Sequence, residues 1–297
     1  MKKKRLGAIL LALSLSGGAV LAAPASAQAA SLKTTAQTQQ VPAAVPLTAE
    51  SAVLYDMNQK EVTAEKNARS RVEPGDLTRL CALLVACENI YSPADRVTIT
   101  KDIQNTVRAQ GGTCLFAAGE TVSVQDLFYA AALTGADDAV LALGRKAAGS
   151  DTVFTLLLNR KANQLGLHNT CFANATGIPG QGSYISAEDA ILLLQAALKN
   201  KTAYSILLSG RWTIGATAQH PDGIQIGQNY KMAMNLMPVP GMAALAMSTE
   251  TGSSFGTLSM FTSWTGKPYL CATLGSSSFA DSVNDQANLF LSYIPGT

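Results

Sequence analysis

The stretch Pro74-Gly75-Asp76-Leu77-Thr78-Arg79-Leu80 opens an apolar helical pattern that continues to Ile90. Aspartate often caps helix N-termini, because its carboxylate accepts hydrogen bonds from the first backbone amides of the helix. We therefore predict a helix over residues 77–90 with Asp76 as its N-cap. Asp76 and Arg79 are three residues apart, a spacing at which opposite charges pair on a helix.

Periodicities on both sides of this stretch predict a protein of mixed α/β class. Residues 52–55 and 61–63 predict an early hairpin, because they flank the turn-forming residues 58–60. Residues 257–263 and 269–274 predict a late hairpin around residues 264–267. Helical spacing runs through residues 124–133, 137–148, 153–165, 186–199 and 283–293. Strands at both ends with helices between them predict a mixed sheet whose terminal segments pair.

The first 29 residues have the composition of a secretory signal peptide. Positive charge at residues 2–5 precedes an apolar run over residues 6–20, and small-residue cleavage sites follow at residues 25–27 and 27–29. That run is short for a membrane span, and no later stretch reaches about 18 uninterrupted apolar residues. We therefore expect an exported protein, secreted or held in the cell envelope, without a membrane span after signal cleavage.

The rest of the chain divides into a linker and one domain. Residues 30–47 are rich in Thr, Gln, Ala and Pro, a composition that buries too little apolar surface to fold. Residues 48–297 have the length of a single domain, and a hydrophobic content of 47% supports a core. The net charge of +2 includes the cations of residues 2–5 and leaves no basic stripe for nucleic acid.

The 5 cysteines carry no sign of a metal site. None forms a Cys-x-x-Cys pair or a cluster with the spacing of zinc ligands. Cys81, Cys87 and Cys271 lie in apolar runs, so we interpret the cysteines as small buried hydrophobic residues, with one disulfide left open. No cofactor is expected.

Five blocks of the chain share the pattern of one protein family. They are residues 60–68, 95–100, 119–129, 159–174 and 184–189. The block Asn159–Asn174 is specific, since it matches N-x-K-A-x-x-L-G-L-x-N-T-x-F-x-N. These blocks resemble the serine-type D-alanyl-D-alanine carboxypeptidases of peptidase family S11, the low-molecular-mass penicillin-binding proteins. The resemblance implies a penicillin-binding protein or β-lactamase-like transpeptidase fold (α+β), with an antiparallel sheet flanked by helices and a helical subdomain.

The family's first catalytic motif, S-x-x-K, is replaced in this chain. Its Ser attacks an amide carbonyl and its Lys activates that Ser. The family pattern Pro-Ala-Ser-Leu-Thr-Lys-Leu aligns with residues 74–80, which places Asp76 at the nucleophile and Arg79 at the base. Asp76 has no hydroxyl, and Arg79 stays protonated at any relevant pH.

The second and third motifs, S-x-N and K-T-G, are also altered. Aligned without a gap, Gly135 replaces the Ser and Asp137 replaces the Asn. A shift of one residue recovers a hydroxyl from Thr134 but requires a deletion, and we prefer the gapless alignment. The third motif falls on Ala246-Met247-Ser248, and the nearby Glu250-Thr251-Gly252 would also lack the lysine. The resemblance therefore implies that the nucleophile and both lysines are lost.

The charges at these motifs oppose the family's usual ligand. A D-Ala-D-Ala peptide ends in a carboxylate, whereas Asp76, Asp137 and Asp138 face Arg79 alone. A unit charge at about 4 Å contributes roughly 4 kcal/mol at an effective dielectric near 20, so reversing its sign turns attraction into repulsion. The carboxylates could also bind a hard cation, but we favour helix capping by the Asp137–Asp138 pair.

Three hypotheses about function follow. The first is a catalytically inactive relative that acts by binding peptidoglycan or an envelope protein. The second is an active carboxypeptidase with relocated residues, such as Thr78, Thr134 or Ser248 as nucleophile and Lys231 as base. The third is a structural domain whose cleft has collapsed. Both histidines, His168 and His220, are expected at the surface, and the methionines around residues 232–247 are expected to fill the core or cleft.

Overall fold

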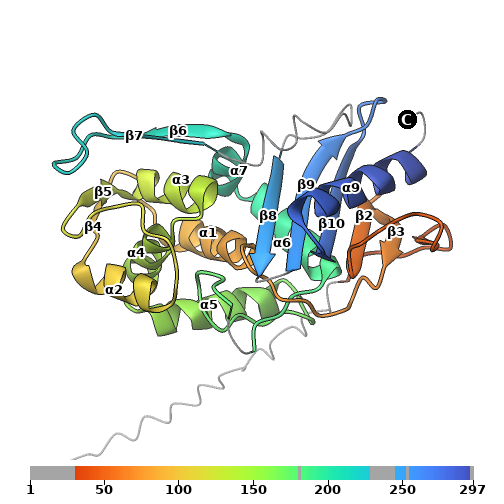
Figure 1. Cartoon of the computed structure of the whole chain (residues 1–297), viewed down its shortest axis with the longest axis horizontal. Coiled ribbons are helices and arrows are strands. Elements are labelled where there is room, and N and C mark those ends of the chain that lie inside the picture. Colours follow the sequence, from red (N-terminus) through yellow and green to blue (C-terminus); the bar gives the residue numbers. More distant parts are fainter. Residues whose placement is uncertain (1–30, 180–181, 228–244, 252–253, 295–297) are drawn as a thin grey trace, which may run out of the picture.

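A six-stranded sheet forms one half of the molecule in the computed structural model, which describes residues 31–179, 182–227, 245–251 and 254–294 (Figure 1). Its strands are β1 (Gln39–Gln40), β2 (Ser51–Asp56), β3 (Glu61–Lys66), β8 (Leu245–Thr251), β9 (Ser254–Thr262) and β10 (Pro268–Ser276). They are ordered β1-β3-β2-β10-β9-β8, and only the β1–β3 pairing among these described strands is parallel. The predicted fold class is confirmed, since this sheet is flanked by helices.

Most of the helices form the other half of the molecule, on the β8 side of the sheet (Figure 1). The helices are α1 (Leu77–Asn89), α2 (Lys101–Ala109), α3 (Val124–Thr134), α4 (Asp137–Ala148), α5 (Asp151–Gln164), α6 (Ala187–Lys199), α7 (Lys201–Leu208) and α9 (Phe279–Tyr293). Two small antiparallel sheets complete the described structure. They pair β4 (Arg96–Thr98) with β5 (Thr121–Ser123), and β6 (Arg211–Ile214) with β7 (Ile224–Gly227).

The two ends of the domain meet at the centre of the sheet, as predicted. β2 from the early hairpin lies antiparallel to β10 from the late hairpin. Every residue of β2 is buried, because α9 covers one face of the sheet and α6 packs against the other. Successive side chains of a strand point to opposite faces. Accordingly, Ala52 and Leu54 belong to the cluster with α9, whereas Val53 and Tyr55 join the main core.

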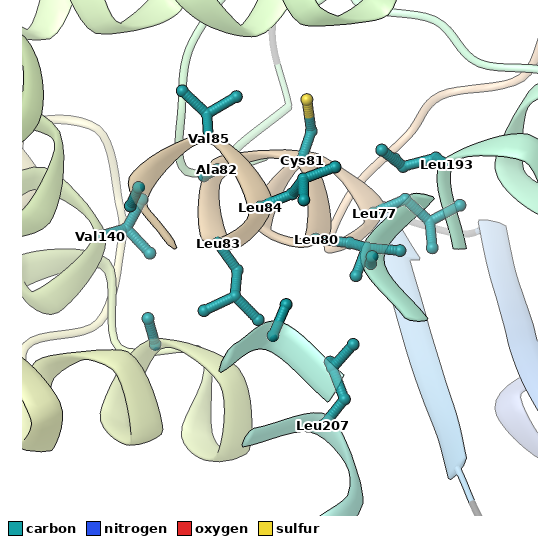
Figure 2. Packing of buried hydrophobic residues seen from close by; sticks show 14 of the residues in the cluster. Leu77, Leu80, Cys81, Ala82, Leu83, Leu84, Val85, Val140, Leu193 and Leu207 are labelled. Atoms are coloured by element: carbon teal, nitrogen blue, oxygen red, sulfur yellow. The ribbon is translucent and has the colours of Figure 1, made fainter. Parts of the chain in front are cut away.

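Helix α1 lies at the centre of the main core. It begins at Leu77, as predicted, and its residues from Leu77 to Ala86 are buried with the exception of Arg79. Figure 2 shows apolar side chains leaving this helix on several sides, toward Val140 of α4, Leu193 of α6 and Leu207 of α7. A helix that is apolar all round must be enclosed by other elements. This enclosure holds residues 76–79 in a rigid position.

Residues 31–41 belong to the folded domain, which differs from the linker that their composition predicts. Gln39 and Gln40 form β1 beside Ala64 and Glu65 of β3. The side chain of Leu32 is buried. These residues attach through backbone hydrogen bonds to the edge of β3 and through one buried leucine. Neither feature depends on the overall composition of the segment.

All five cysteines are free thiols, so the disulfide that was left open does not form. Within the part of the chain that the structure describes, no helix combines the length and the apolar character needed to cross a membrane. The predicted signal peptide and residues 228–244, which include Lys231, lie outside the described residues.

Candidate functional site

Asp76 and Arg79 form an ion pair at the start of α1. An oxygen of the Asp76 carboxylate lies 2.5 Å from Nη2 of Arg79. Asp76 is the N-cap residue of α1, as predicted, but its side chain makes no capping hydrogen bond. The backbone of Asp76 is already helical, at φ −63° and ψ −16°. A capping carboxylate needs an extended backbone in order to reach the first amides.

Arg79 joins three segments that are distant in sequence. Its Nη1 donates to Oδ1 of Asp137 at 3.2 Å and to the main-chain oxygen of Thr176 at 2.8 Å. The side chain of Arg79 is only 15% exposed. The planar guanidinium can hold several acceptors in a fixed geometry, which an ammonium group does less well. We call Asp76, Arg79, Asp137 and the Thr176 carbonyl the Arg79 cluster.

Asp137 is a buried carboxylate at the first position of α4. Its Oδ2 accepts a hydrogen bond from the Thr113 amide at 2.9 Å, and its own amide donates to the Thr113 carbonyl at 2.9 Å. Burial raises the pKa of the Asp137 carboxyl, although the charge of Arg79 and the Thr113 amide act in the opposite direction. The ionised form therefore depends on these two partners.

Asp138 does not take part in the Arg79 cluster. Its Oδ2 accepts hydrogen bonds from the amides of Leu115 and Phe116, at 3.0 and 2.9 Å. The expectation of three carboxylates around one cation is therefore corrected to two carboxylates bound to Arg79. Among the described residues no group of three metal-ligating side chains is close enough to hold an ion.

The structure brings Gly135 and Asp137, rather than Thr134, beside Arg79. Gly135 ends α3 at φ +68°, and a Cβ built there would lie 3.1 Å from Nη2 of Arg79. The hydroxyl of Thr134 instead donates to the Ala130 carbonyl at 2.8 Å within α3. The gapless alignment of the second motif stays a prediction. The guanidinium fills the space that a side chain at position 135 would need.

The loop that carries Thr176 is shaped by Asn174, the last residue of the family block 159–174, and by Gly177. Oδ1 of Asn174 accepts from the amides of Thr176 and Gly177, at 3.1 and 2.8 Å. Gly177 has φ +81°, and a Cβ built on it would lie 2.1 Å from the Gly75 carbonyl oxygen. No local pattern in the sequence indicated that the Thr176 carbonyl would bind Arg79.

The third motif lies on β8, which ends the described sheet on the side of the helical half (Figure 1). Ala246, Met247 and Ser248 pair with Ser259, Leu258 and Thr257 of β9. Their side chains, and with them Ser248 as a nucleophile, lie outside what the structure describes. The hydroxyl of Thr78 is buried and makes no hydrogen bond among the described residues, so no base contacts it there.

We expect that Asp137→Asn, which restores the family's residue in the gapless alignment, destabilises the protein by about 1–3 kcal/mol. Arg79 donates to one oxygen of the Asp137 carboxylate and the Thr113 amide donates to the other. An asparagine has only one acceptor oxygen, so one of these donors would face its amide group. Urea denaturation of the variant measures the change. As a control, Asp102→Asn removes a carboxylate whose side chain is 76% exposed, and should shift stability by at most about 0.5 kcal/mol. Equal effects of the two substitutions would contradict the prediction.

Comparisons with known proteins point to one family. A family profile described as D-alanyl-D-alanine carboxypeptidase (peptidase S11) matches residues 35–220. The D-alanyl-D-alanine carboxypeptidase DacA of Escherichia coli K12 is 30% identical over 237 residues, which cover 72% of this chain and 59% of that protein. DacF of Bacillus subtilis strain 168 is 30% identical over 152 residues, with 51% and 39% covered. The chain thus spans 59% or less of the length of these relatives.

Solved structures show the same fold. A mutant of the Streptomyces K15 DD-transpeptidase superposes with a TM-score of 0.73 at 22% identity, covering 83% of this chain and 97% of that one. Penicillin binding protein 6B from Escherichia coli gives a TM-score of 0.72 at 22% identity, covering 83% and 77%. At this level of identity the likeness concerns the fold and leaves the activity open.

Proposed function

Since the chain belongs to the D-alanyl-D-alanine carboxypeptidase family (peptidase S11), we propose that it is a non-catalytic member that acts by binding. The observation that carries this proposal is the Arg79 cluster. Where the resemblance expects a serine beside a lysine, the structure has an aspartate bound to an arginine. The scaffold of the family is retained while its reactive groups are exchanged.

The chemistry of the Arg79 cluster supports loss of catalysis. Covalent catalysis needs a hydroxyl or thiol within hydrogen-bond reach of a group that can accept its proton. Asp76 has no hydroxyl, and a guanidinium does not give up its proton in proteins. Gly135, at the position of the second serine, provides no hydroxyl either. The two carboxylates bound to Arg79 also occupy donors that could otherwise bind a substrate carboxylate.

We propose that the ligand is part of the cell envelope, either peptidoglycan or a protein associated with it. Curated relatives are named as D-alanyl-D-alanine carboxypeptidases, so the scaffold is suited to peptides that end in D-Ala-D-Ala. The leader composition of residues 1–29 supports export, which would place the domain beside this material. Binding without turnover is the simplest use of a retained scaffold.

Penicillin labelling and D-alanine release test the loss of catalysis. We expect no acyl adduct with a fluorescent penicillin, and release of D-alanine from diacetyl-Lys-D-Ala-D-Ala at least about a million-fold below that of an authentic carboxypeptidase. A loss of this size follows removal of the nucleophile in a hydrolytic triad. A stable adduct, or turnover within a thousand-fold of the control enzyme, would overturn the proposal and favour an active carboxypeptidase with relocated residues.

Co-sedimentation with purified peptidoglycan sacculi tests the binding role separately. We expect the domain to pellet with sacculi and to remain in solution without them. If the domain stays in solution in the presence of sacculi, and if no envelope protein binds to it, the binding role is wrong. The third hypothesis, a purely structural domain, then replaces it. This measurement is independent of catalysis, so each half of the proposal can fail alone.

A further inference from the structure

The β6–β7 hairpin forms an arm, residues 211–227, that lies along α3 and reaches toward β5 (Figure 1). At its base, the ring of Trp212 stacks on Tyr129 of α3, with centroids 3.9 Å apart and planes 4° from parallel. Nε1 of Trp212 also donates to Oδ1 of Asp126 at 2.8 Å. The base of the arm is therefore fastened to the start and middle of α3.

The tip of the arm is fastened to a different group, the carboxylate of Glu120. This residue directly precedes β5 and is 0% exposed. One of its oxygens accepts from Oγ1 of Thr217 at 2.6 Å and lies 2.8 Å from Nδ1 of His220. Its other oxygen accepts from the Ala117 amide at 2.8 Å. His220, expected at the surface, is thus partly enclosed and bound to a buried acid.

The arm supplies two of the three hydrogen-bond donors, Thr217 and His220, that offset the cost of burying the Glu120 carboxylate. Burying a charge is costly unless it is paired and hydrogen-bonded. Burial opposes ionisation of Glu120, but the hydrogen bonds from Thr217, His220 and Ala117, together with the attraction of His220, outweigh it and lower the pKa of Glu120. Ionisation of Glu120 and docking of the arm therefore support each other.

We propose that Glu120 and His220 form an acid-sensitive latch that holds the tip of the arm against the helical half of the molecule. Protonation turns one oxygen of Glu120 into a hydroxyl donor, so Thr217, His220 and the Ala117 amide must share one carbonyl acceptor, and the negative charge that attracts His220 is lost. An arm held at its base alone can then separate at residues 216–223. The latch concerns a part of the chain distinct from the Arg79 cluster and does not depend on the proposed function.

The direction of the pH dependence follows from Glu120. A carboxyl whose pKa is lowered on folding contributes stability above its unfolded pKa, near 4.3 for glutamate, and this stability is lost as the pH falls through the folded pKa.

Other charged groups also lie around the arm. Asp222 is in the tip itself, and Asp126 binds the base through Nε1 of Trp212 and, at 3.4 Å, through the Gly215 amide. Arg96 of β4 donates to the main-chain oxygen of Thr121, next to Glu120. Of these groups, Asp126 is a second carboxylate that holds the arm, at its base. The experiment must therefore distinguish loosening of the tip from loosening of the base.

Hydrogen exchange of the full chain, followed by mass spectrometry and corrected for intrinsic exchange rates, tests the latch at the tip. In the wild type we expect protection of residues 216–223 to be the same at pH 7 and pH 5 and to fall about 3-fold or more between pH 5 and pH 3, while far-UV circular dichroism still reports a folded domain. Glu120→Gln should show this loss already at pH 7. Glu73→Gln, which removes an exposed carboxyl, is the matched control and should behave as the wild type.

Two further variants keep the test decisive. Thr217→Val deletes one donor to Glu120 and should lower protection of the tip at pH 7 even if Glu120→Gln does not fold. Asp126→Asn should loosen residues 211–215 more than the tip. Unchanged protection of the tip between pH 5 and pH 3 in the wild type, or wild-type protection at pH 7 in both Glu120→Gln and Thr217→Val, would overturn the latch.

Discussion

Replacing Arg79 with methionine is expected to lower the free energy of unfolding by about 3–5 kcal/mol, the usual cost of removing one partner from a buried ion pair. The reason lies with Asp137, whose carboxylate is 5% exposed and loses its only cation among the described residues. The Thr176 carbonyl loses a donor as well. Asp76, whose side chain is 34% exposed, should contribute little to the cost.

The cost of Arg79→Met should depend on pH. Burial already raises the pKa of Asp137 while Arg79 opposes that shift, so removal of Arg79 raises this pKa further. A carboxyl with a raised folded pKa loses stability as the pH rises from its unfolded pKa, near 3.9, through its folded pKa. The variant should therefore differ least from the wild type below about pH 4 and most at neutral pH.

Urea denaturation of Arg79→Met at several pH values measures both effects. Arg160→Met is the matched control, because Arg160 is exposed and makes no ion pair among the described residues, and it should shift stability by at most about 0.5 kcal/mol. Arg79→Lys, which keeps the charge but not the fork of donors, should fall between the two. Equal stability of Arg79→Met and Arg160→Met would show that the Arg79 cluster does not stabilise the fold.

Replacing Gly177 with alanine is expected to cost about 2–5 kcal/mol. The left-handed backbone of Gly177, at φ +81°, accounts for about 1–2 kcal/mol of this cost once a Cβ is present. The rest comes from overpacking, because the new Cβ would lie 2.1 Å from the Gly75 carbonyl oxygen. That oxygen belongs to the main chain at the start of α1, so the clash should displace the turn before Asp76.

Gly119→Ala separates the two contributions. Gly119 has φ +84°, but a Cβ built there meets nothing within 4 Å. This control should therefore lose only the backbone contribution of about 1–2 kcal/mol. Thermal or urea unfolding of both variants gives the comparison. If Gly119→Ala is as unstable as Gly177→Ala, close packing between residues 75 and 177 has no measurable effect on stability.

The sequence by itself determined α1, the two hairpins of the main sheet and the pairing of the two ends of the domain, but it did not predict α2, α7 or the β6–β7 hairpin. Apolar spacing after Pro74-Gly75 predicted α1, and alternating residues around two turns predicted both hairpins. The pairing of β2 with β10 followed from strands at both ends of the chain. These features depend on periodicity and turn chemistry, which act over a few residues and are visible in the order of residue types.

Tertiary structure alone decided which polar groups meet. The Asp76 side chain pairs with Arg79 instead of capping α1, Asp138 turns to the amides of Leu115 and Phe116, and residues 31–41 join the edge of β3. The contact between Glu120 and His220 spans 100 residues. Such partners are backbone groups or distant side chains brought together by burial, and a buried charge takes whichever donors the packed core places beside it.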